Sequence, residues 1–359
     1  MTQAAGGRAP DPAFWRGRRV LLTGHSGFKG AWAALWLRRL GAEVHGFALA
    51  PDTEPSLWIE AGEGLLTAET RADLADAAAV RDAVAEARPE IVLHLAGQAL
   101  IRRAAQAPLE TVLTNTLGTA NLLEALRACD SLRAAVIVTT DKVYDNDESG
   151  RAFAESDRLG GDEPYGASKA AAEILTRAWA RSWFAPRGIG IATARAGNVI
   201  GGGNWSADRL VPDIWRAAVR GEPLVLRAPS ATRPWQHVLE PLAGYFLYAE
   251  ALAAGGDVPQ ALNFGPAEGA PVTVAEIARS MAEALGVERP WRVEPDPGLG
   301  EARLLALDSS LARARLGWRP RLAAPEAVAW TASWYAAHRG GADTRTLCLD
   351  QIDRYEALP

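Results

Sequence analysis

Short apolar runs alternate with segments of helical periodicity through the first half of the chain. The apolar runs occupy residues 19–24, 43–49, 90–97, 134–140 and 188–197. Helical patterns lie between them at residues 30–41, 77–89, 109–129 and 165–184. Buried parallel strands that alternate with covering helices produce this pattern. It predicts an α/β fold with an open, Rossmann-like, doubly wound parallel sheet.

The alternation becomes irregular after Gly203. Residues 221–237 have the pattern of strand and loop, and helical patterns return at 273–286, 307–320 and 325–338. A chain of 359 residues also exceeds the roughly 150 residues of one average domain. We therefore expect a smaller mixed α/β domain, partly interleaved with the first. The expected ranges are 1–200 with about 232–258 for the Rossmann domain, and about 201–231 with 259–359 for the smaller one.

Composition excludes several classes of protein. The chain is 48% hydrophobic and 23% charged, and its net charge of -5 leaves no broad basic surface for nucleic acid. We find no run of 18 apolar residues and no signal peptide, so we expect a cytoplasmic protein that does not bind membranes. Cys129 and Cys348 lack the spacing of a disulfide framework or a metal site. The histidines also lack ligand spacing, which predicts structural roles for His25, His45, His94, His237 and His338.

A glycine-rich loop, "LLTGHSGFKG", lies between a predicted strand and a predicted helix. Glycines at this position let backbone N–H groups at a helix N-terminus approach a pyrophosphate. The alternative is a tight strand-to-helix turn without a ligand. The context favours a dinucleotide site, and the expected cofactor-binding residues here are Gly24, Ser26, Gly27, Phe28, Lys29 and Gly30.

The type of dinucleotide depends on the end of the second strand. An acidic residue there selects the ribose hydroxyls of NAD, whereas a basic residue accepts the phosphate of NADP. The segment "HGFALAPD" offers neither at the strand end, and Asp52 comes late. NAD is favoured, and NADP is not excluded. Asp73 and Leu74 follow another strand and are candidates for contacts with the adenine, although Asp73 could equally be a solvated loop residue.

Tyr165 and Lys169 are four residues apart on a predicted helix that Pro164 helps to start. This spacing places both side chains on one face. A nearby ammonium lowers the pKa of a phenol from about 10, which makes the phenol a better base. With Thr140 at the end of a preceding strand, the pair predicts a hydride-transfer site at the carboxyl ends of the sheet. An isolated pair would more often be a surface tyrosine beside a solvated lysine.

The stretch "TTDKVYDN" adds two charged residues to this edge. Thr140, Asp141 and Lys142 follow an apolar run directly, and adjacent side chains in a regular strand face opposite sides of the sheet. Asp141 and Lys142 can reach one site only if the strand ends by Thr140 and the chain turns there.

Several blocks together resemble the extended short-chain dehydrogenase/reductase superfamily, and within it the nucleotide-sugar 4,6-dehydratases. The resemblance runs from about Phe14 to Ala337 and narrows to the CDP-glucose branch on the blocks "TTDKVYDN", "DEPYGASKAAAE", "ARAGNVIGGGNW", "RLVPDIW" and "RPWQHVLEPLAGY". It implies an NAD-dependent lyase, a hydro-lyase, that converts CDP-D-glucose to CDP-4-keto-6-deoxy-D-glucose and water. The reaction would oxidise C4, eliminate water across C5 and C6, and return the hydride to C6.

The resemblance also implies catalytic roles. Tyr165 would deprotonate the C4 hydroxyl, Thr140 would hydrogen-bond that oxygen, and Lys169 would hold the nicotinamide ribose and lower the phenol pKa. Asp141 would protonate the leaving C6 hydroxyl. Lys142 stands where the dTDP-glucose enzymes carry glutamate, and it would either remove the C5 proton or, as an ammonium, stabilise the developing enolate.

Further site residues follow from the same resemblance. Ala96, Gly97 and Gln98 would lie along the cofactor, and Asn115 would distort its helix near the active site. The expected substrate-binding residues are Asn198, Arg209, Arg233 and Gln236. For each arginine, a solvated or structural ion pair is the alternative, and Trp205 and Trp235 are loop tryptophans that could contact substrate.

Assembly and pathway are expectations of the same kind. The superfamily implies a homodimer or a dimer of dimers, and the reaction implies deoxysugar biosynthesis, such as that of lipopolysaccharide O-antigen. An epimerase, a reductase or another dehydratase of the superfamily is the alternative function. A catalytically idle nucleotide-binding regulator would usually lack Tyr165 or Lys169. The Ala- and Gly-rich tail before Phe14 is expected to be disordered.

Overall fold

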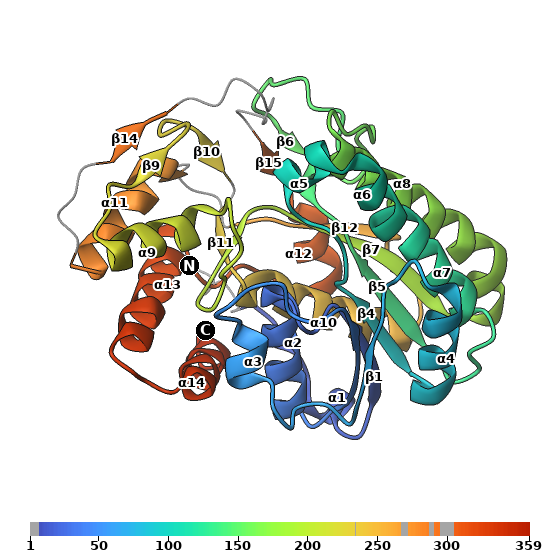
Figure 1. Cartoon of the computed structure of the whole chain (residues 1–359). Coiled ribbons are helices and arrows are strands. Elements are labelled where there is room, and N and C mark those ends of the chain that lie inside the picture. Colours follow the sequence, from blue (N-terminus) through green and yellow to red (C-terminus); the bar gives the residue numbers. More distant parts are fainter. Residues whose placement is uncertain (1–6, 234, 267–271, 287–290, 295–304) are drawn as a thin grey trace, which may run out of the picture.

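A seven-stranded parallel sheet forms the centre of the protein (Figure 1). The structure is a computed structural model that describes residues 7–233, 235–266, 272–286, 291–294 and 305–359. The strands are β1 (Arg19–Thr23), β2 (Glu43–Ala48), β3 (Ala68–Arg71), β4 (Ile91–His94), β5 (Ala134–Val138), β7 (Gly190–Ala196) and β12 (Ala261–Phe264). Their order, β12-β7-β5-β4-β1-β2-β3, confirms the predicted doubly wound, Rossmann-like fold.

The strand order reverses direction at β1, whose two neighbours are β2 and β4. The chain runs outward through β2 and β3 on one side, then returns to β4 and continues through β5, β7 and β12 on the other. In open parallel sheets, ligands bind beyond the carboxyl ends of the strands at such a switch point. The fold therefore predicts a site beyond the ends of β1 and β4.

Separate groups of helices cover the two faces of the sheet (Figure 1). Val20 and Leu22 point to one face and Leu21 to the other, as the period of two in a strand requires. The first face packs against α2 (Phe28–Arg39) and α10 (Leu239–Ala254), and the second packs against α4 (Ala77–Ala87) and α7 (Gly118–Leu126). Trp32 and Trp36 of α2 are fully buried in the core on the first face.

The second region combines helices with short strand pairs. Its helices are α9 (Leu210–Arg220), α11 (Val274–Ala284), α12 (Ser310–Leu316) and α13 (Ala324–Arg339). The short pairs are β6 (Ala152–Phe153) with β15 (Ala306–Leu307), β8 (Val199–Ile200) with β11 (Gln236–His237), β9 (Val225–Leu226) with β14 (Arg292–Val293), and β10 (Thr232–Arg233) with β13 (Val272–Thr273).

The C-terminal part of the chain contributes to both regions. Strand β12 belongs to the large sheet, although it lies in the range expected for the smaller domain, because its backbone pairs with β7 from Ala261 to Phe264. The last helix, α14 (Thr344–Glu356), packs on α2 and on α3 (Leu57–Ala61). Both β12 and α14 lie in the range predicted for the smaller domain, but they pack on elements of the range predicted for the Rossmann domain. The remaining domain limits stay a prediction.

The prediction of disorder before Phe14 is wrong for residues 7–13. The Arg8 guanidinium donates to Glu250 Oε2 over 2.9 Å, and the Asp11 N–H donates to Glu250 Oε1 over 2.8 Å. A short helix, α1 (Pro12–Trp15), follows, and the Trp15 indole N–H donates to the same carboxylate. A buried acid in α10, 242 residues along the chain from Arg8, therefore fixes this segment, and no local pattern reveals it. Residues 1–6 lie outside the described part.

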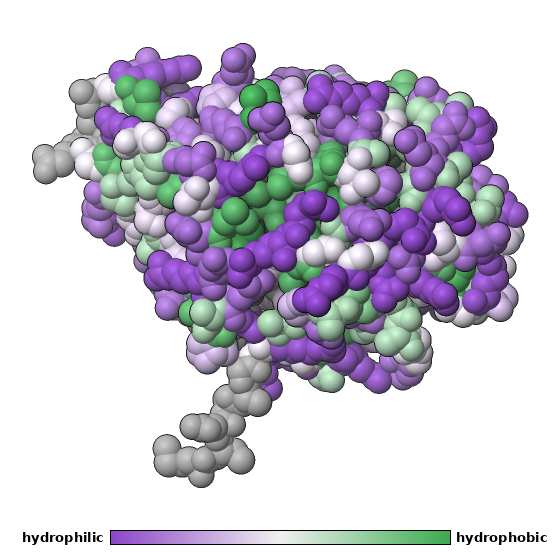
Figure 2. Space-filling view, turned by 90° about the horizontal axis from the view of Figure 1, so that it is seen from below, coloured by the Kyte–Doolittle hydropathy of each residue, from purple (hydrophilic) through white to green (hydrophobic). Residues whose placement is uncertain are grey.

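The face of the molecule shown in Figure 2 is mainly hydrophilic, with apolar side chains gathered near its centre. No helix in the described part of the chain is both long enough and apolar enough to cross a membrane.

Candidate active site

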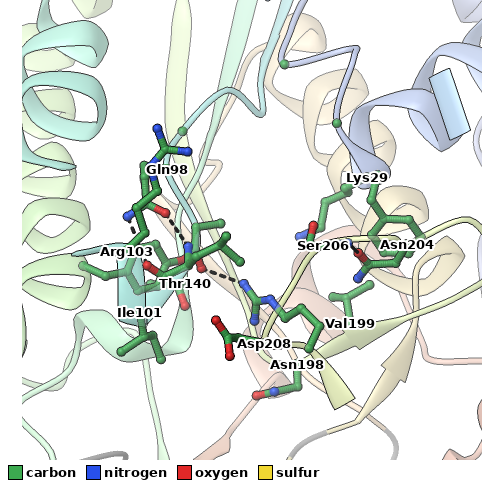
Figure 3. Close-up of a pocket in the computed structure, with 18 of the residues that line it drawn as sticks. Lys29, Gln98, Ile101, Arg103, Thr140, Asn198, Val199, Asn204, Ser206 and Asp208 are labelled. Atoms are coloured by element: carbon green, nitrogen blue, oxygen red, sulfur yellow. Dashed lines mark hydrogen bonds between the residues drawn. The ribbon is translucent and has the colours of Figure 1, made fainter. Parts of the chain in front are cut away.

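A cavity of about 620 Å³ lies at the carboxyl ends of the strands, between the sheet and the second region. Figure 3 shows Gln98 and Thr140 on one side of it and Lys29 and Asn204 on the other. The predicted residues that line it are Gly24, Ser26, Gly27, Phe28, Lys29, Gly30, Asp73, Leu74, Ala96, Gly97, Gln98, Thr140, Asp141, Lys142, Tyr165, Lys169, Asn198 and Arg209. Asn115 and Gln236 lie behind its wall. For Arg233 the structure describes only the backbone.

The glycines of the loop let its backbone pack closely against neighbouring segments. Gly24 has a φ of +76°, and a Cβ there would lie 2.6 Å from the Ala96 nitrogen. A Cβ on Gly30 would lie 2.0 Å from the Gly24 carbonyl oxygen. Gly27 caps helix α2 without a side chain, so the first N–H groups of the helix face the cavity free of a side-chain cap. This cradle fits the pyrophosphate of a dinucleotide.

The loop after β2 carries an acid and no base. Residues 49–52 line the cavity, and among them only Asp52 is charged. Asp73 also lines it, while its carboxylate accepts the Ala75 N–H over 2.9 Å. Without a lysine or arginine in residues 49–52, this loop has no cation for the phosphate of NADP, which favours NAD.

The chain turns directly after Thr140, as predicted. Strand β5 ends at Val138, Thr140 is extended, and Asp141–Val143 forms a single 3₁₀ turn. The Thr140 hydroxyl donates to Asp141 Oδ1 over 2.9 Å. The predicted turn is confirmed, and it brings Asp141 and Lys142 to the same cavity.

Asp141 is 1% exposed, and one of its oxygens is unusual. Oδ2 is buried and accepts no hydrogen bond from any group in the described part of the chain. The Lys142 ammonium lies 3.7 Å from the other oxygen, Oδ1, and is partly exposed. A buried acceptor without a partner costs free energy unless a ligand or water satisfies it. Asp141 is therefore placed to hydrogen-bond a bound molecule.

Helix α8 (Pro164–Trp179) presents Tyr165 and Lys169 on one buried face. Its first turn is fixed by Glu163, whose carboxylate accepts the N–H groups of Tyr165 and Gly166 over 2.7 Å each. The Lys169 ammonium donates to the carbonyl oxygen of Val138, the last residue of β5, over 3.2 Å. Tyr165 and Lys169 therefore lie opposite the turn that carries Thr140.

Burial shifts the pKa values of both side chains. Burial raises the pKa of Tyr165, contrary to the lowering expected from Lys169, and a hydrogen bond with Thr140 opposes that rise. Burial lowers the pKa of Lys169 to about 8, and the charge of Glu173 opposes that fall. Lys29 also has a pKa of about 8, because of burial and then of the nearby Lys169 and Arg209. Three cations in one cavity suit a ligand that carries phosphates.

Asn115 orders the cavity wall without lining it. It sits in a π-helical turn, Leu113–Leu117, which confirms the expected distortion of the helix. Its side chain accepts the Gln98 N–H over 2.8 Å and donates to the Gln98 carbonyl and to Ser168. Asn115 thereby joins the loop after β4 to helix α8.

The residues predicted to bind substrate are dispersed. Asn198 lines the cavity, and its carbonyl oxygen accepts the Gln236 N–H. Gln236 is 1% exposed, and its side-chain amide donates to the Phe264 carbonyl, because β11 directs it toward the end of β12. Arg209 begins α9 and donates to the Ala99 carbonyl over 2.6 Å.

Other residues line the cavity that no sequence motif indicated. Arg103, Asp208 and Arg227 come from loops or helices that only the fold brings to this edge, so a local pattern could not have revealed them. Trp235 lines the cavity as expected, whereas Trp205 is buried against Trp215 and Tyr335.

Comparison with known proteins agrees with this geometry. The family described as the NAD dependent epimerase/dehydratase family matches residues 20–265, which include the glycine loop, the turn at Asp141 and helix α8. The chain belongs to this family.

Individual members of the family are similar over most of the chain. The CDP-glucose 4,6-dehydratase of Salmonella typhimurium is 40% identical over 96% of this chain and 98% of its own length. The dTDP-glucose 4,6-dehydratase of Streptomyces antibioticus is 30% identical over 75% of this chain and 76% of its own. Among solved structures, the UDP-glucose 4-epimerase of Thermus thermophilus in complex with NAD has a TM-score of 0.74 at 27% identity, covering 90% of this chain and all of its own.

Lys169 gives a prediction about stability. Its pKa is about 8 in the folded chain and 10.5 for an unperturbed lysine, so the unfolded chain binds more protons between these values. The contribution of Lys169 to the free energy of unfolding therefore rises as the pH increases from 8 toward 10. Replacing Lys169 by methionine removes the cost of burying the charge. Lys169→Met should be more stable than the wild type at pH 7, by up to about 3 kcal/mol.

Urea denaturation at several pH values measures this difference. The advantage of the methionine variant should shrink between pH 8 and 10, as the wild-type ammonium loses its proton. A variant that is less stable than the wild type by the same amount at every pH would contradict the buried charge.

Proposed function

We propose that this protein is an NAD-dependent CDP-D-glucose 4,6-dehydratase, a lyase that forms CDP-4-keto-6-deoxy-D-glucose and water. One observation carries the proposal. The buried Asp141, with one oxygen that no described group satisfies, shares a cavity with the Tyr165 and Lys169 pair. An epimerase or a reductase needs the pair but not an adjacent acid for elimination. The 40% identity with the Salmonella typhimurium enzyme supports CDP-D-glucose as the substrate.

The first step oxidises C4: its hydrogen leaves as a hydride, and its hydroxyl loses a proton. Tyr165 takes the proton of the C4 hydroxyl, and Thr140 hydrogen-bonds the same oxygen. The Lys169 ammonium, one turn along α8 from Tyr165, would hold the nicotinamide ribose and stabilise the phenolate as it forms. NAD, held by the loop from Gly24 to Gly30, would supply the redox chemistry, which is uptake of the C4 hydride and its return to C6.

Elimination follows because the C4 ketone makes the C5 proton acidic. Asp141 protonates the departing C6 hydroxyl as the general acid. Two roles fit Lys142: it removes the C5 proton as an amine, or as an ammonium it stabilises the negative charge that develops on the C4 oxygen. Its position 3.7 Å from Asp141 Oδ1 is compatible with both.

We propose that the cofactor and the substrate bind in different parts of the cavity. The cradle of Gly24, Gly27 and Gly30 fits the cofactor pyrophosphate, with Asp73 and Leu74 toward the adenosine. Asn198 and Arg209 line the opposite part and are proposed to bind the substrate diphosphate with Arg233. Gln236 supports this part through its hydrogen bond to Asn198.

Incubation with CDP-D-glucose and NAD tests the proposed function. The product should develop the alkaline absorbance of a 4-keto-6-deoxy sugar. Turnover of dTDP- or GDP-glucose, without turnover of CDP-D-glucose, would overturn the substrate assignment. A 4-epimer or a reduced sugar as the product would overturn the reaction.

Replacing the general acid separates elimination from binding. Asp141→Asn should lower kcat by about 10²- to 10⁴-fold and leave NAD binding, measured by titration calorimetry, unchanged. Asp147→Asn, in the exposed loop that follows, is the matched control and should keep full activity. A normal rate for Asp141→Asn would remove this residue from the mechanism.

An apolar surface suits pairing of two chains. Helix α6 (Pro108–Val112), the π-helical turn after it and α8 contact one another, and their outer sides expose Leu109, Val112, Leu113, Leu117 and Ile174. The most exposed of them, Leu109, is 70% exposed. Such a cluster on neighbouring helices is unusual for a monomer. We propose that a second copy covers it in a homodimer, or in a dimer of dimers.

Charge on this surface should separate the chains. Leu113→Glu combined with Ile174→Glu is expected to halve the mass measured by light scattering, because two charges would be buried at the interface. Ile59→Glu, on the exposed side of α3, is the control and should leave the mass unchanged. A wild-type monomer, or a variant that stays paired, would contradict the proposed interface.

We also propose a cytoplasmic location and a place in deoxysugar biosynthesis. The two cysteines are unpaired and buried, which suits a reducing cytoplasm. The 4-keto-6-deoxy product suits consumption in deoxysugar biosynthesis, such as that of lipopolysaccharide O-antigen.

A further inference from the structure

Glu173 is a buried carboxylate with every acceptor position used. It receives hydrogen bonds from the hydroxyls of Thr139 (2.5 Å) and Thr193 (2.7 Å). Arg195 adds two more in a bidentate pair, at 2.9 and 2.7 Å. Both charged side chains are less than 5% exposed. A buried pair of this kind is costly to form and specifies geometry once it is fully hydrogen-bonded.

This ion pair holds both ends of the turn at Asp141. Thr139 directly precedes Thr140 and binds Glu173. Tyr144 directly follows the 3₁₀ turn, and its hydroxyl accepts a hydrogen bond from Arg195 Nη1 over 2.8 Å. Tyr144 then donates to Asn263 over 2.7 Å. The segment that carries Thr140, Asp141 and Lys142 is thus fixed on either side by one buried pair.

The Glu173–Arg195 pair is also connected to the Tyr165–Lys169 pair, because Glu173 belongs to the same helix, α8. Glu173 lies one helical turn beyond Lys169 and two beyond Tyr165, on the same buried face of α8. A displacement of Glu173 would therefore move the turn at Asp141 relative to Tyr165. Neither Glu173 nor Arg195 lines the cavity within the described chain, and Thr139, which does line it, has its hydroxyl bonded to Glu173.

We propose that Glu173, Arg195 and Thr139 are positioning residues that fix the distance between the Thr140–Lys142 turn and the Tyr165–Lys169 pair. This inference rests on the proposed function, because it assigns the two groups to consecutive steps on one sugar. The proton acceptor for C4 and the proton donor for C6 must both be in place without rebinding of the sugar. A displacement of about 1 Å at such a site costs on the order of 10²-fold in rate.

Thr139→Val tests the proposal, because it keeps the shape of the side chain and removes the hydroxyl that binds Glu173. We expect kcat with CDP-D-glucose to fall about 10- to 100-fold, while the KM changes less than about twofold, since the hydroxyl that is removed bonds Glu173 and not the cavity. Thr139→Ser keeps the hydroxyl and should restore the rate.

Thr193→Val is the matched control. It removes the other hydroxyl bound to Glu173, from strand β7, and Thr193 does not line the cavity in the described chain. Both valine variants should lower the melting temperature to a similar extent, but only Thr139→Val should lower kcat. Equal kcat values for the two, or no rescue by serine, would overturn the positioning role.

If the proposed function is wrong, the result differs from a failure of the positioning role. In that case the wild type itself would not convert CDP-D-glucose, and the same comparison of variants would be made on the nucleotide sugar that it does convert. Glu173→Gln provides a second measurement if it folds: it keeps hydrogen-bond capacity and removes the charge, and kcat should fall with KM unchanged.

Discussion

The hydrogen bond from Lys169 to the carbonyl oxygen of Val138 connects the two halves of the active site. It joins the helix that carries Tyr165 to the strand whose end carries Thr140 and Asp141. The ammonium is also buried, so its pKa falls to about 8. Burying this charge costs free energy, and the proposed roles of Lys169, stabilising the phenolate and holding the nicotinamide ribose, require the charge at this place.

The parallel sheet makes this arrangement compact. All seven strands end at one edge, so the loop after β1, the loop after β4 and the turn after β5 meet there although they are far apart in the sequence. The second region covers the edge with α9 and the segment from Asn198 to Asp213. Lys29, Lys169 and Arg209 then face one cavity, where two diphosphates could neutralise them.

Local patterns predicted the features that depend on neighbours in sequence. Alternating apolar runs gave the sheet, and the glycine spacing gave the cradle at Gly24 and Gly30. The demand that Asp141 and Lys142 face one site gave the turn after Thr140. Features that depend on distant partners were missed or misplaced. The segment at Arg8 is fixed by Glu250, Gln236 is directed toward β12, and Glu173 meets Arg195 through the pairing of separate elements. No periodicity in the sequence records those partners.

The central claim is that oxidation, elimination and reduction take place on one sugar without its release. CDP-D-glucose with deuterium at C4 measures this directly, by mass spectrometry and nuclear magnetic resonance of the product. The account predicts that the deuterium appears at C6 of the same molecule and that the C5 hydrogen comes from solvent. Deuterium transferred between differently labelled molecules, or lost to added NAD, would contradict it.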